Sequence, residues 1–369
     1  MKLRSAELRV IAVPDAYADH STDTYPSPDL SLAAYTTLRL GGPAGTLTTA
    51  VHSDEAVAAV RAASESDRPL LVLAGGSNVV IGDEGFPGDV LVLRTSGFEV
   101  VEEDEDRVVV RVASGERWDS FVAYAVGRGW SGVECLSGIP GSAGATPIQN
   151  VGAYGQEVAH TIVAVHAYDR EAGEVRAMTP PECAFGYRAS VFKHNDRFLV
   201  LSVDFRLEVS PDSAPIRYAE LARQLGVEAG DRVPLGQARD TVLKLRAGKG
   251  MVLDPEDRDT WSVGSFFTNP VVSAGSFAEL AAREEIPHWP APDGTVKIPA
   301  AWLIEHAGFP KGFAGAGVSI STKHTLALTN RGAGTTTALL DLARVIRDGV
   351  RERFGVELHP EPVLVNCEL

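Results

Sequence analysis

Hydrophobic and polar positions alternate along several segments in the middle of the chain. Residues 198–209 follow this two-residue period, which predicts a strand with one buried face. That face carries Leu199, Leu201, Val203, Phe205 and Leu207. Residues 107–114 alternate in the same way, and the short apolar runs at 71–74 and 90–94 predict buried strands. We therefore expect mostly β-structure between about residues 96 and 250.

Other segments have the spacing and the end signals of helices. Ser53 predicts the start of one helix, because serine caps helix amides and acidic residues follow it. Residues 118–129 predict a helix that ends at a glycine. Pro299 at the first helical position and Gly308 at the end predict a third helix, and residues 335–355 predict a fourth. The apolar positions of the fourth helix are Leu339, Leu342, Ile346, Val350 and Phe354. This mixture predicts an α+β fold with several small domains.

Composition narrows the class of protein. At 369 residues the chain exceeds the usual size of a single core, and its 44% hydrophobic and 22% charged residues are typical of globular proteins. A net charge of -15 argues against nucleic acid or an anionic membrane as a partner. No signal peptide and no run of about 18 apolar residues is visible, so we expect a cytoplasmic protein without membrane insertion. The three cysteines form no CxxC pair and the histidines no HExxH motif, so we expect no metal ion.

Two glycine-rich segments are the first candidates for a binding site. Ala74-Gly75-Gly76-Ser77-Asn78 follows a predicted strand, and its successive amides could form an anion-binding nest, although an ordinary tight turn is the alternative. A Rossmann motif is excluded because the third glycine is missing. Residues 138–155 contain five glycines and two prolines, which rules out a helix or a central strand. Because Ile148, Val151 and Tyr154 are apolar, we expect this segment to line a large flat or phosphorylated ligand rather than form a surface loop.

Six blocks of sequence together resemble the UDP-N-acetylenolpyruvoylglucosamine reductase family. They are AGGSNVV (74–80), GIPGSAGATPIQNVGAYGQEV (138–158), CAFGYRASVFKHN (183–195), VGSFFTNPVV (263–272), AAWLIEHAGFPKG (300–312) and FGVELHPE (354–361). They occur in the order typical of the family and extend the resemblance from about Tyr35 to Glu361. The resemblance implies an FAD-binding fold of the vanillyl-alcohol-oxidase type in two subdomains, followed by a smaller α+β substrate-binding domain.

The resemblance also implies domain boundaries. We expect a flexible N-terminal extension at 1–30, FAD-binding subdomain 1 at 31–95 with 355–369, FAD-binding subdomain 2 at 96–250, and the substrate-binding domain at 251–354. The block PIRYAEL (215–221) resembles the insert of the longer type of this family, and it places Tyr218 at the position of a substrate-contacting tyrosine.

A reaction and a cofactor follow from the same resemblance. It implies that NADPH reduces FAD, and that the flavin reduces UDP-N-acetylglucosamine enolpyruvate to UDP-N-acetylmuramate in peptidoglycan precursor synthesis, in a monomer. The residues expected to bind FAD are Gly75, Gly76, Ser77, Asn78, Gly138, Ile139, Pro140, Gly141, Ser142, Gln149, Asn150, Gly152, Ala153 and Tyr154.

Three residues match the catalytic positions of the family. Arg188 is expected to face the enolpyruvyl carboxylate, for which a planar guanidinium is a bidentate partner. Ser265 is expected to donate the proton to the carbon that becomes carbanionic. Glu361 is the expected catalytic glutamate, protonated or bridged by a donor because an ionised carboxylate would repel the developing charge. Glu357 and Glu368 are the alternatives for this position.

Three further residues match substrate-binding positions. Lys249 and Asn269 are expected to contact the phosphates and the sugar. Tyr218 is expected to close over the nucleotide, with a simple partly buried helix tyrosine as the alternative.

Two rival functions remain open. An oxidase of the same FAD fold would share the glycine-rich lining but would have no need of the Arg188, Ser265 and Glu361 blocks together. A non-catalytic protein that binds flavin or a nucleotide sugar would need no proton donor.

Overall fold

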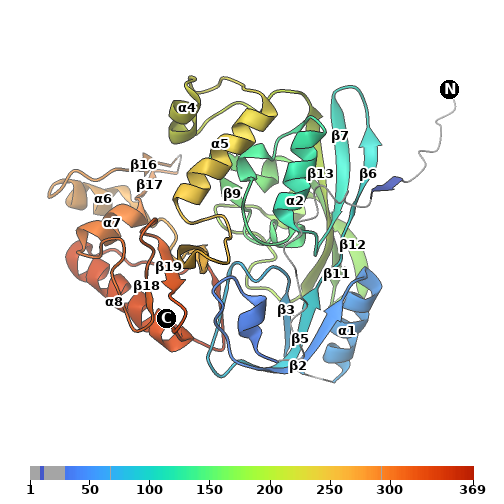
Figure 1. Ribbon diagram of the computed structural model, residues 1–369, viewed down its shortest axis with the longest axis horizontal. Coiled ribbons are helices and arrows are strands. Elements are labelled where there is room, and N and C mark those ends of the chain that lie inside the picture. The colour runs from blue at the N-terminus through green and yellow to red at the C-terminus, as the bar shows by residue number, and fades with distance from the viewer. Residues whose placement is uncertain (1–8, 12–29, 67, 292) are drawn as a thin grey trace. The chain divides into compact units, whose positions relative to one another are not determined.

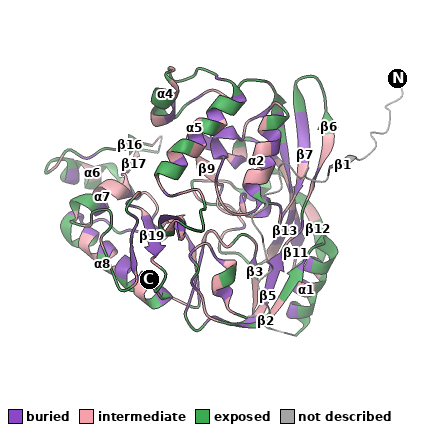
Figure 2. Ribbon diagram, in the orientation of Figure 1, coloured by how far each residue is buried: buried purple, intermediate pink, exposed green. Residues whose placement is uncertain are grey.

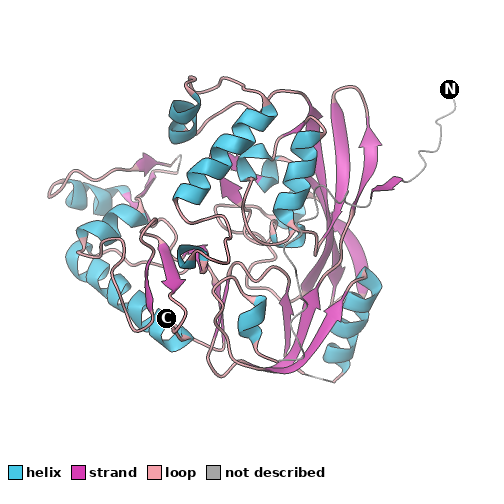
Figure 3. Cartoon of the chain, viewed as in Figure 1, coloured by secondary structure: helices cyan, strands magenta, loops and turns pink. Residues whose placement is uncertain are grey.

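The computed structural model describes residues 9–11, 30–66, 68–291 and 293–369. Its described residues form two compact units. The first unit comprises strand β1 (Arg9–Ile11), Gly45–Gly75 and Pro87–Ala247. The second comprises Leu30–Ala44, Gly76–Phe86 and Gly248–Leu369. Most of the predicted extension at 1–30 lies outside the described residues, and the predicted domain boundaries stay a prediction. Both units mix helices with strands, which confirms the α+β class (Figure 3).

The first unit is built on a seven-stranded sheet. Six of its strands pair in the order β1 (Arg9–Ile11), β6 (Phe98–Glu103), β7 (Arg107–Ala113), β13 (Phe198–Val209), β11 (Ile162–Asp169) and β12 (Glu174–Met178), and β8 (Trp130–Ser131) also pairs with β13. All these pairings are antiparallel (Figure 1). The strands predicted at 107–114 and 198–209 are confirmed, the second with those bounds.

Strand β13 buries its apolar residues on two faces, not on the single face that the sequence predicts. His166 pairs with Ser202, whereas the next residue of β11, Ala167, pairs with Val200, so Leu201 is an extra residue in β13. Such a bulge reverses which side chains point to each face. Leu199 and Leu201 therefore pack with the helix α1 (Ser53–Glu65), while Val203, Phe205 and Leu207 pack with the helix α2 (Trp118–Gly127). Figure 2 shows that much of β13 is buried.

Helices and a smaller sheet complete the first unit. Helix α2 (Trp118–Gly127) buries Trp118 and Phe121 against Phe205, with ring centroids 5.4 and 5.5 Å from the Phe205 ring. The smaller sheet has the order β2 (Ala44–Ala50), β5 (Phe86–Leu93), β3 (Leu70–Leu73), and β3 runs parallel to β5. The remaining elements are α3 (Pro180–Cys183), α4 (Ala219–Leu225), α5 (Leu235–Gly248), β9 (Gly152–Ala153) and β10 (Gln156–Glu157).

Helix α1 (Ser53–Glu65) begins one residue earlier than predicted. Ser53 is its first helical residue and His52 is its N-cap. The Glu55 carboxylate accepts hydrogen bonds from the amides of Val51 and His52, at 2.9 and 3.1 Å. Glu55 therefore satisfies the amide of the N-cap residue from the first turn of the helix, as in a capping box.

The described residues of the second unit form three small sheets. The first sheet has the strand order β14 (Ser262–Ser265), β19 (Ala327–Asn330), β18 (Val318–Ile320). The second has the order β15 (Val271–Ser273), β17 (Thr295–Lys297), β16 (Trp289–Pro290). In the third, β20 (Val363–Val365) runs parallel to β4 (Val79–Ile81). Its helices are α6 (Ala274–Ala281), α7 (Ala300–His306) and α8 (Thr336–Phe354).

Helix α8 confirms the fourth predicted helix. It starts after the N-cap Thr335, whose hydroxyl accepts from the Ala338 amide at 3.1 Å, and it ends at Gly355 with φ +68°. Its predicted apolar positions are buried in the core of the second unit. In α7, Pro299 is the N-cap rather than the first helical residue. Among the residues that the structure describes, no helix is both long and apolar enough to cross a membrane.

Candidate functional site

The long glycine-rich segment of the first unit is shielded from solvent, with each of residues 138–154 either buried or half-buried. The segment contains only a short 3-10 turn and strand β9. The alternative of a surface loop is therefore wrong. Because the segment is buried yet irregular, its backbone is available to line a ligand.

The two predicted glycine loops meet in the first unit. A Cβ atom on Gly75 would lie 2.5 Å from the Cα of Gly141, so a side chain at position 75 would displace the other loop. The neighbouring Gly76 belongs to the second unit, where it adopts φ +57° and a Cβ would lie 1.9 Å from the Tyr35 carbonyl oxygen. Both positions require glycine because of close backbone approach.

The hydroxyl of Ser142 supports a ligand at this place. Ser142 is 3% exposed, and its Oγ has no hydrogen-bond partner among the described residues. A buried polar group left in this state costs about 1–3 kcal/mol. A bound group with a hydrogen-bonding atom at Ser142 would remove that cost. The close-packed glycines and this hydroxyl fit a phosphate-bearing cofactor such as FAD.

Three predicted site residues have unusual backbone conformations. Asn150, Tyr154 and Arg188 lie in the left-handed region, with φ of +45°, +48° and +52°. Non-glycine residues in this region are strained, and such strain clusters at functional sites. Hydrogen bonds join the 138–155 segment to the 183–195 block. Arg188 Nη2 donates to the Gly152 carbonyl at 3.0 Å, and Asn150 Nδ2 donates to the Gly186 carbonyl at 3.1 Å.

Tyr218 lies beside the glycine-rich segment. It is the N-cap residue of α4 and is 43% exposed, so it is not part of a helix interior. Its ring meets the Tyr154 ring edge to face, with centroids 5.4 Å apart. The proposed insert and the proposed flavin lining are therefore in contact within the first unit.

Charged residues that the sequence reasoning missed support this segment. Asp119 on α2 accepts from the Gly138 amide at 2.6 Å and pairs through both oxygens with Arg239 on α5, at 2.7 and 2.9 Å. Burial raises the pKa of Asp119, but the Arg239 hydrogen bonds outweigh it and hold the pKa below its usual value. Arg246, also on α5, is buried, and this burial lowers its pKa to about 10 despite the opposing influence of Tyr154 and Asp119. Arg239 and Arg246 are seven residues apart, and this spacing places both on one face of α5. That spacing is the sequence signal that could have indicated them.

In the second unit, backbone hydrogen bonds place Glu361 beside the segment that carries Ser265. The Glu361 amide donates to the Phe266 carbonyl at 2.9 Å, and the Thr268 amide donates to the His359 carbonyl at 3.0 Å. The Val363 amide also donates to the Asn78 carbonyl at 3.0 Å. Three predicted site residues, Asn78, Ser265 and Glu361, thus lie on neighbouring segments.

Ser265 follows an irregularity in its strand. Ser262 pairs with Thr329 and Ser265 with Ala327, so an extra residue lies between them, and Gly264 adopts φ +73°. A bulge of this kind re-aims the side chain that follows it and is common next to active sites.

Thr37 is another residue that sequence reasoning missed. Its amide donates to the Gly76 carbonyl at 3.1 Å, and its hydroxyl donates to the Ser262 carbonyl at 2.6 Å. It therefore joins the proposed flavin loop to the strand of Ser265 across 225 residues of sequence. No local pattern could have indicated so distant a contact.

The proposed substrate residues of the second unit lie near element ends. Asn269 Oδ1 accepts from the Ala300 amide at 2.9 Å, at the start of α7. Lys249 precedes Gly250, which adopts φ +65°.

Two family models cover most of the chain. Residues 46–179 match an FAD binding domain, and residues 254–365 match the C-terminal domain of UDP-N-acetylenolpyruvoylglucosamine reductase. The UDP-N-acetylenolpyruvoylglucosamine reductase of Salinispora arenicola (strain CNS-205) is 60% identical over 356 residues, which cover 95% of this chain and 98% of that protein. The protein of the same name from Streptomyces coelicolor is 57% identical over 351 residues, covering 92% and 90%. The chain belongs to the UDP-N-acetylenolpyruvoylglucosamine reductase family.

A solved structure supports the same fold. The crystal structure of the Thermus caldophilus UDP-N-acetylenolpyruvylglucosamine reductase matches 97% of this chain and 100% of that chain, with a TM-score of 0.62 and 24% identity. The resemblance, the FAD-binding fold and the FAD cofactor expected from the sequence are therefore confirmed.

The family's matched positions are divided between the units. Arg188, Tyr218 and the 138–154 segment belong to the first unit, whereas Ser265 and Glu361 belong to the second. Within the described residues, no group of three or more histidine, cysteine, aspartate or glutamate side chains could hold a metal ion.

Proposed function

We propose that this chain catalyses the NADPH-dependent reduction of UDP-N-acetylglucosamine enolpyruvate to UDP-N-acetylmuramate, a step of peptidoglycan precursor synthesis. The observation that carries this proposal is the 60% identity, over 95% of the chain, to the UDP-N-acetylenolpyruvoylglucosamine reductase of Salinispora arenicola. The presence of Arg188, Ser265 and Glu361 in the matching motifs supports it further. We also propose a cytoplasmic location and a monomeric state.

FAD, when bound, supplies the chemistry that carries a hydride from NADPH to the enolpyruvyl group. We assign its binding to the two glycine-rich segments, residues 74–78 and 138–155. Gly75 and Gly141 allow the two backbones to approach, and Ser142 offers a buried hydroxyl that has no hydrogen-bond partner within the described part of the chain. Asp119 and Arg239 hold the start of this segment at the Gly138 amide.

Arg188 is proposed to bind the enolpyruvyl carboxylate. Negative charge develops on this carboxylate and the adjacent carbon during reduction, and a fixed guanidinium stabilises it. The hydrogen bond to the Gly152 carbonyl and the left-handed backbone restrict where the side chain of Arg188 lies. Such restriction is what a charge-stabilising group requires, because little reorganisation is then needed during the reaction.

Ser265 and Glu361 are proposed to deliver the proton. A serine hydroxyl is a weak acid, so it needs a polar neighbour that assists transfer. Glu361 belongs to the segment that hydrogen-bonds to Phe266, the residue after Ser265. We propose that Ser265 donates to the carbanionic carbon and that Glu361 supports that transfer.

Lys249, Asn269 and Tyr218 are proposed to hold the nucleotide sugar. Lys249 supplies a positive charge for the phosphates in a chain with a net charge of -15. Tyr218 is exposed and already contacts the Tyr154 ring, so it offers an aromatic face to a ligand.

The test is the identity of the product. Purified protein is incubated without oxygen with NADPH and UDP-N-acetylglucosamine enolpyruvate in D₂O, and the product is analysed by mass spectrometry. We expect the mass of UDP-N-acetylmuramate with one deuteron on carbon from solvent. In a parallel incubation in air, hydrogen peroxide formation without this product would favour the oxidase. Bound flavin without turnover in either incubation would favour the binding protein.

A further inference from the structure

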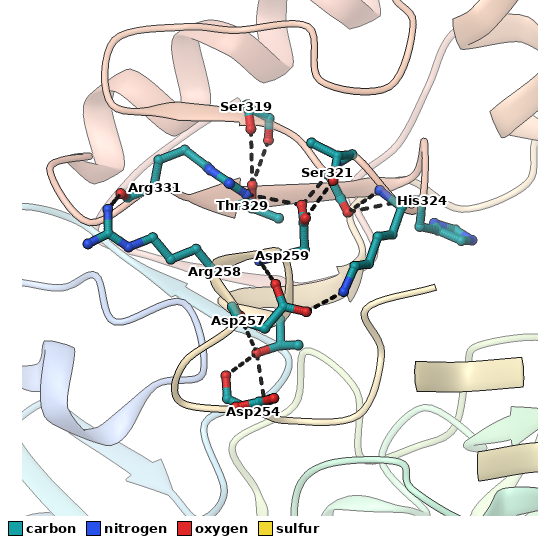
Figure 4. Close-up of polar contacts among 12 residues, drawn as sticks. Asp254, Asp257, Arg258, Asp259, Ser319, Ser321, His324, Thr329 and Arg331 are labelled. Carbon is teal, nitrogen blue, oxygen red and sulfur yellow. Dashed lines mark hydrogen bonds and ion pairs between the residues drawn. The ribbon is translucent and has the colours of Figure 1, made fainter. Parts of the chain in front are cut away.

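A network of charged and hydroxyl side chains in the second unit joins the loop after Lys249 to the turn between β18 and β19 (Figure 4). Asp259 is at its centre and is 5% exposed. Its carboxylate accepts from the Thr322 amide at 2.9 Å, from the Thr322 hydroxyl at 2.6 Å, and from Arg331 Nη1 at 3.0 Å. Burial raises the pKa of Asp259, but these hydrogen bonds and the Arg331 charge outweigh it, so its pKa is lowered and it is ionised at neutral pH.

Backbone contacts connect the turn that Asp259 holds to the strand of Ser265. Thr322 follows Ser321, whose amide donates to the Ala327 carbonyl at 2.8 Å. Ala327 is the residue that pairs with Ser265 across the β14–β19 ladder. The Phe266 amide also donates to the Leu326 carbonyl at 2.7 Å. Asp259 therefore fixes the turn whose last residues hold Ser265 and Phe266.

The bulge before Ser265 makes this support necessary. Regular alternation would fix the direction of Ser265 from the strand alone, but the register shift and the φ of +73° at Gly264 break that alternation. The direction of the hydroxyl then depends on where β19 lies. A misplacement of about 1 Å is enough to slow a reaction by about 100-fold.

Asp259 also touches the backbone next to Lys249. A Cβ on Gly250 would lie 3.1 Å from the Asp259 carbonyl oxygen, so the chain after Lys249 packs directly on this residue. The other charged contacts of the network are more exposed. In the Asp257–Lys323 pair, for example, the lysine side chain is 39% exposed, and such pairs contribute little to structure.

We propose that Asp259 is a positioning residue of the reaction, which holds the β18–β19 turn so that Ser265 is aimed for proton delivery. This rests on the proposed role of Ser265. Asp259 itself touches no reacting atom in this proposal and acts only through Thr322 and β19.

The experiment separates the two half-reactions in Asp259→Asn by anaerobic stopped-flow absorbance of the holoenzyme. We expect reoxidation of the flavin by saturating UDP-N-acetylglucosamine enolpyruvate to slow by about tenfold. Reduction by NADPH should stay within about twofold of the parent rate. In Asp259→Asn combined with Ser265→Ala, reoxidation should equal that of Ser265→Ala alone, because a residue that acts through Ser265 has nothing left to position.

Asp169→Asn in the first unit is the matched control. Asp169 is also fully buried, pairs with Arg197 at 2.7 and 2.9 Å, and accepts from the amides of a turn. We expect it to lower the thermal midpoint while both half-reactions keep their rates. Thr322→Val removes only one hydrogen bond to Asp259 and should show a weaker form of the Asp259→Asn pattern, which keeps the test valid if Asp259→Asn does not fold.

The positioning role would be overturned by an unchanged reoxidation rate in both Asp259→Asn and Thr322→Val. Equal slowing of both half-reactions in Asp259→Asn, or full additivity of its effect with that of Ser265→Ala, would also overturn it. Normal reoxidation in Ser265→Ala itself would instead show that the proposed function of Ser265 has failed, and the inference with it.

Discussion

The two units hold their proposed site residues by different physical means. In the first unit, close glycine backbones, a buried irregular segment and left-handed residues form the proposed flavin site. In the second, backbone hydrogen bonds join the segments of Ser265 and Glu361, and the buried Asp259 accepts hydrogen bonds from the turn before β19. A cofactor that stays bound can be held by static packing, whereas a proton donor must be aimed. The difference predicts that a variant that separates the glycine loops of the first unit loses cofactor, whereas variants at or around Ser265 in the second unit keep the cofactor and lose a reaction step.

Gly75→Ala should produce the largest loss. The new Cβ would lie 2.5 Å from the Gly141 Cα, so the two glycine loops must separate and FAD should be absent from the purified protein. The flavin-to-protein absorbance ratio measures this. Gly236→Ala, where nothing lies within 4 Å of the new Cβ, should retain FAD. Full FAD content in Gly75→Ala would show that the loops do not form the cofactor site.

Arg188→Ala should lower kcat/KM for the enolpyruvyl substrate by roughly 100- to 1,000-fold, as is typical for loss of a charge-stabilising group. It should nevertheless bind FAD, which distinguishes it from Gly75→Ala although both residues belong to the first unit. Arg188→Lys keeps the charge without the bidentate geometry, so its kcat/KM should lie between those of the parent and of Arg188→Ala. Steady-state kinetics that do not change in Arg188→Ala would remove it from the site.

Ser142→Ala should weaken FAD binding by about fivefold, since a single hydrogen bond contributes about 1 kcal/mol. The FAD-free protein should become slightly more stable, because a buried hydroxyl without a partner is removed. Ser131→Ala is the control: its hydroxyl is also buried without a partner among the described residues, but it lies in β8, outside the glycine loops. Equal FAD affinity in the two variants would contradict the assignment of Ser142.

Glu116→Gln should have the smallest effect. Burial raises the pKa of Glu116 above its ordinary value, although the Gly97 amide opposes this. A carboxyl group with a raised folded-state pKa destabilises the fold above its unfolded-state value of about 4.5, and this cost disappears below that pH. The glutamine variant should therefore melt about 2 °C higher than the parent at pH 7 and at the same temperature near pH 4. A lower midpoint at pH 7 would contradict this interpretation.

Local sequence patterns predicted the elements better than their contacts. Strand β13 and helix α8 follow directly from two-residue and helical spacing. The irregular segment after Gly138 was indicated by its glycines and prolines, and its shielding from solvent by its apolar residues. The bulge at Leu201 was not predictable, because a single extra residue changes the buried face without changing composition. The Thr37–Ser262 hydrogen bond and the Asp259–Thr322 contacts join residues far apart in sequence, and no local signal records such pairs.

The most direct test of the division between the units is Ser265→Ala, measured by anaerobic stopped-flow absorbance. The account predicts normal FAD content, normal bleaching of the flavin by NADPH, and reoxidation by UDP-N-acetylglucosamine enolpyruvate that is slower by roughly 100- to 10,000-fold, as for loss of a general acid. Loss of FAD, or equal slowing of bleaching and reoxidation, would show that Ser265 supports the structure of the protein rather than the delivery of a proton.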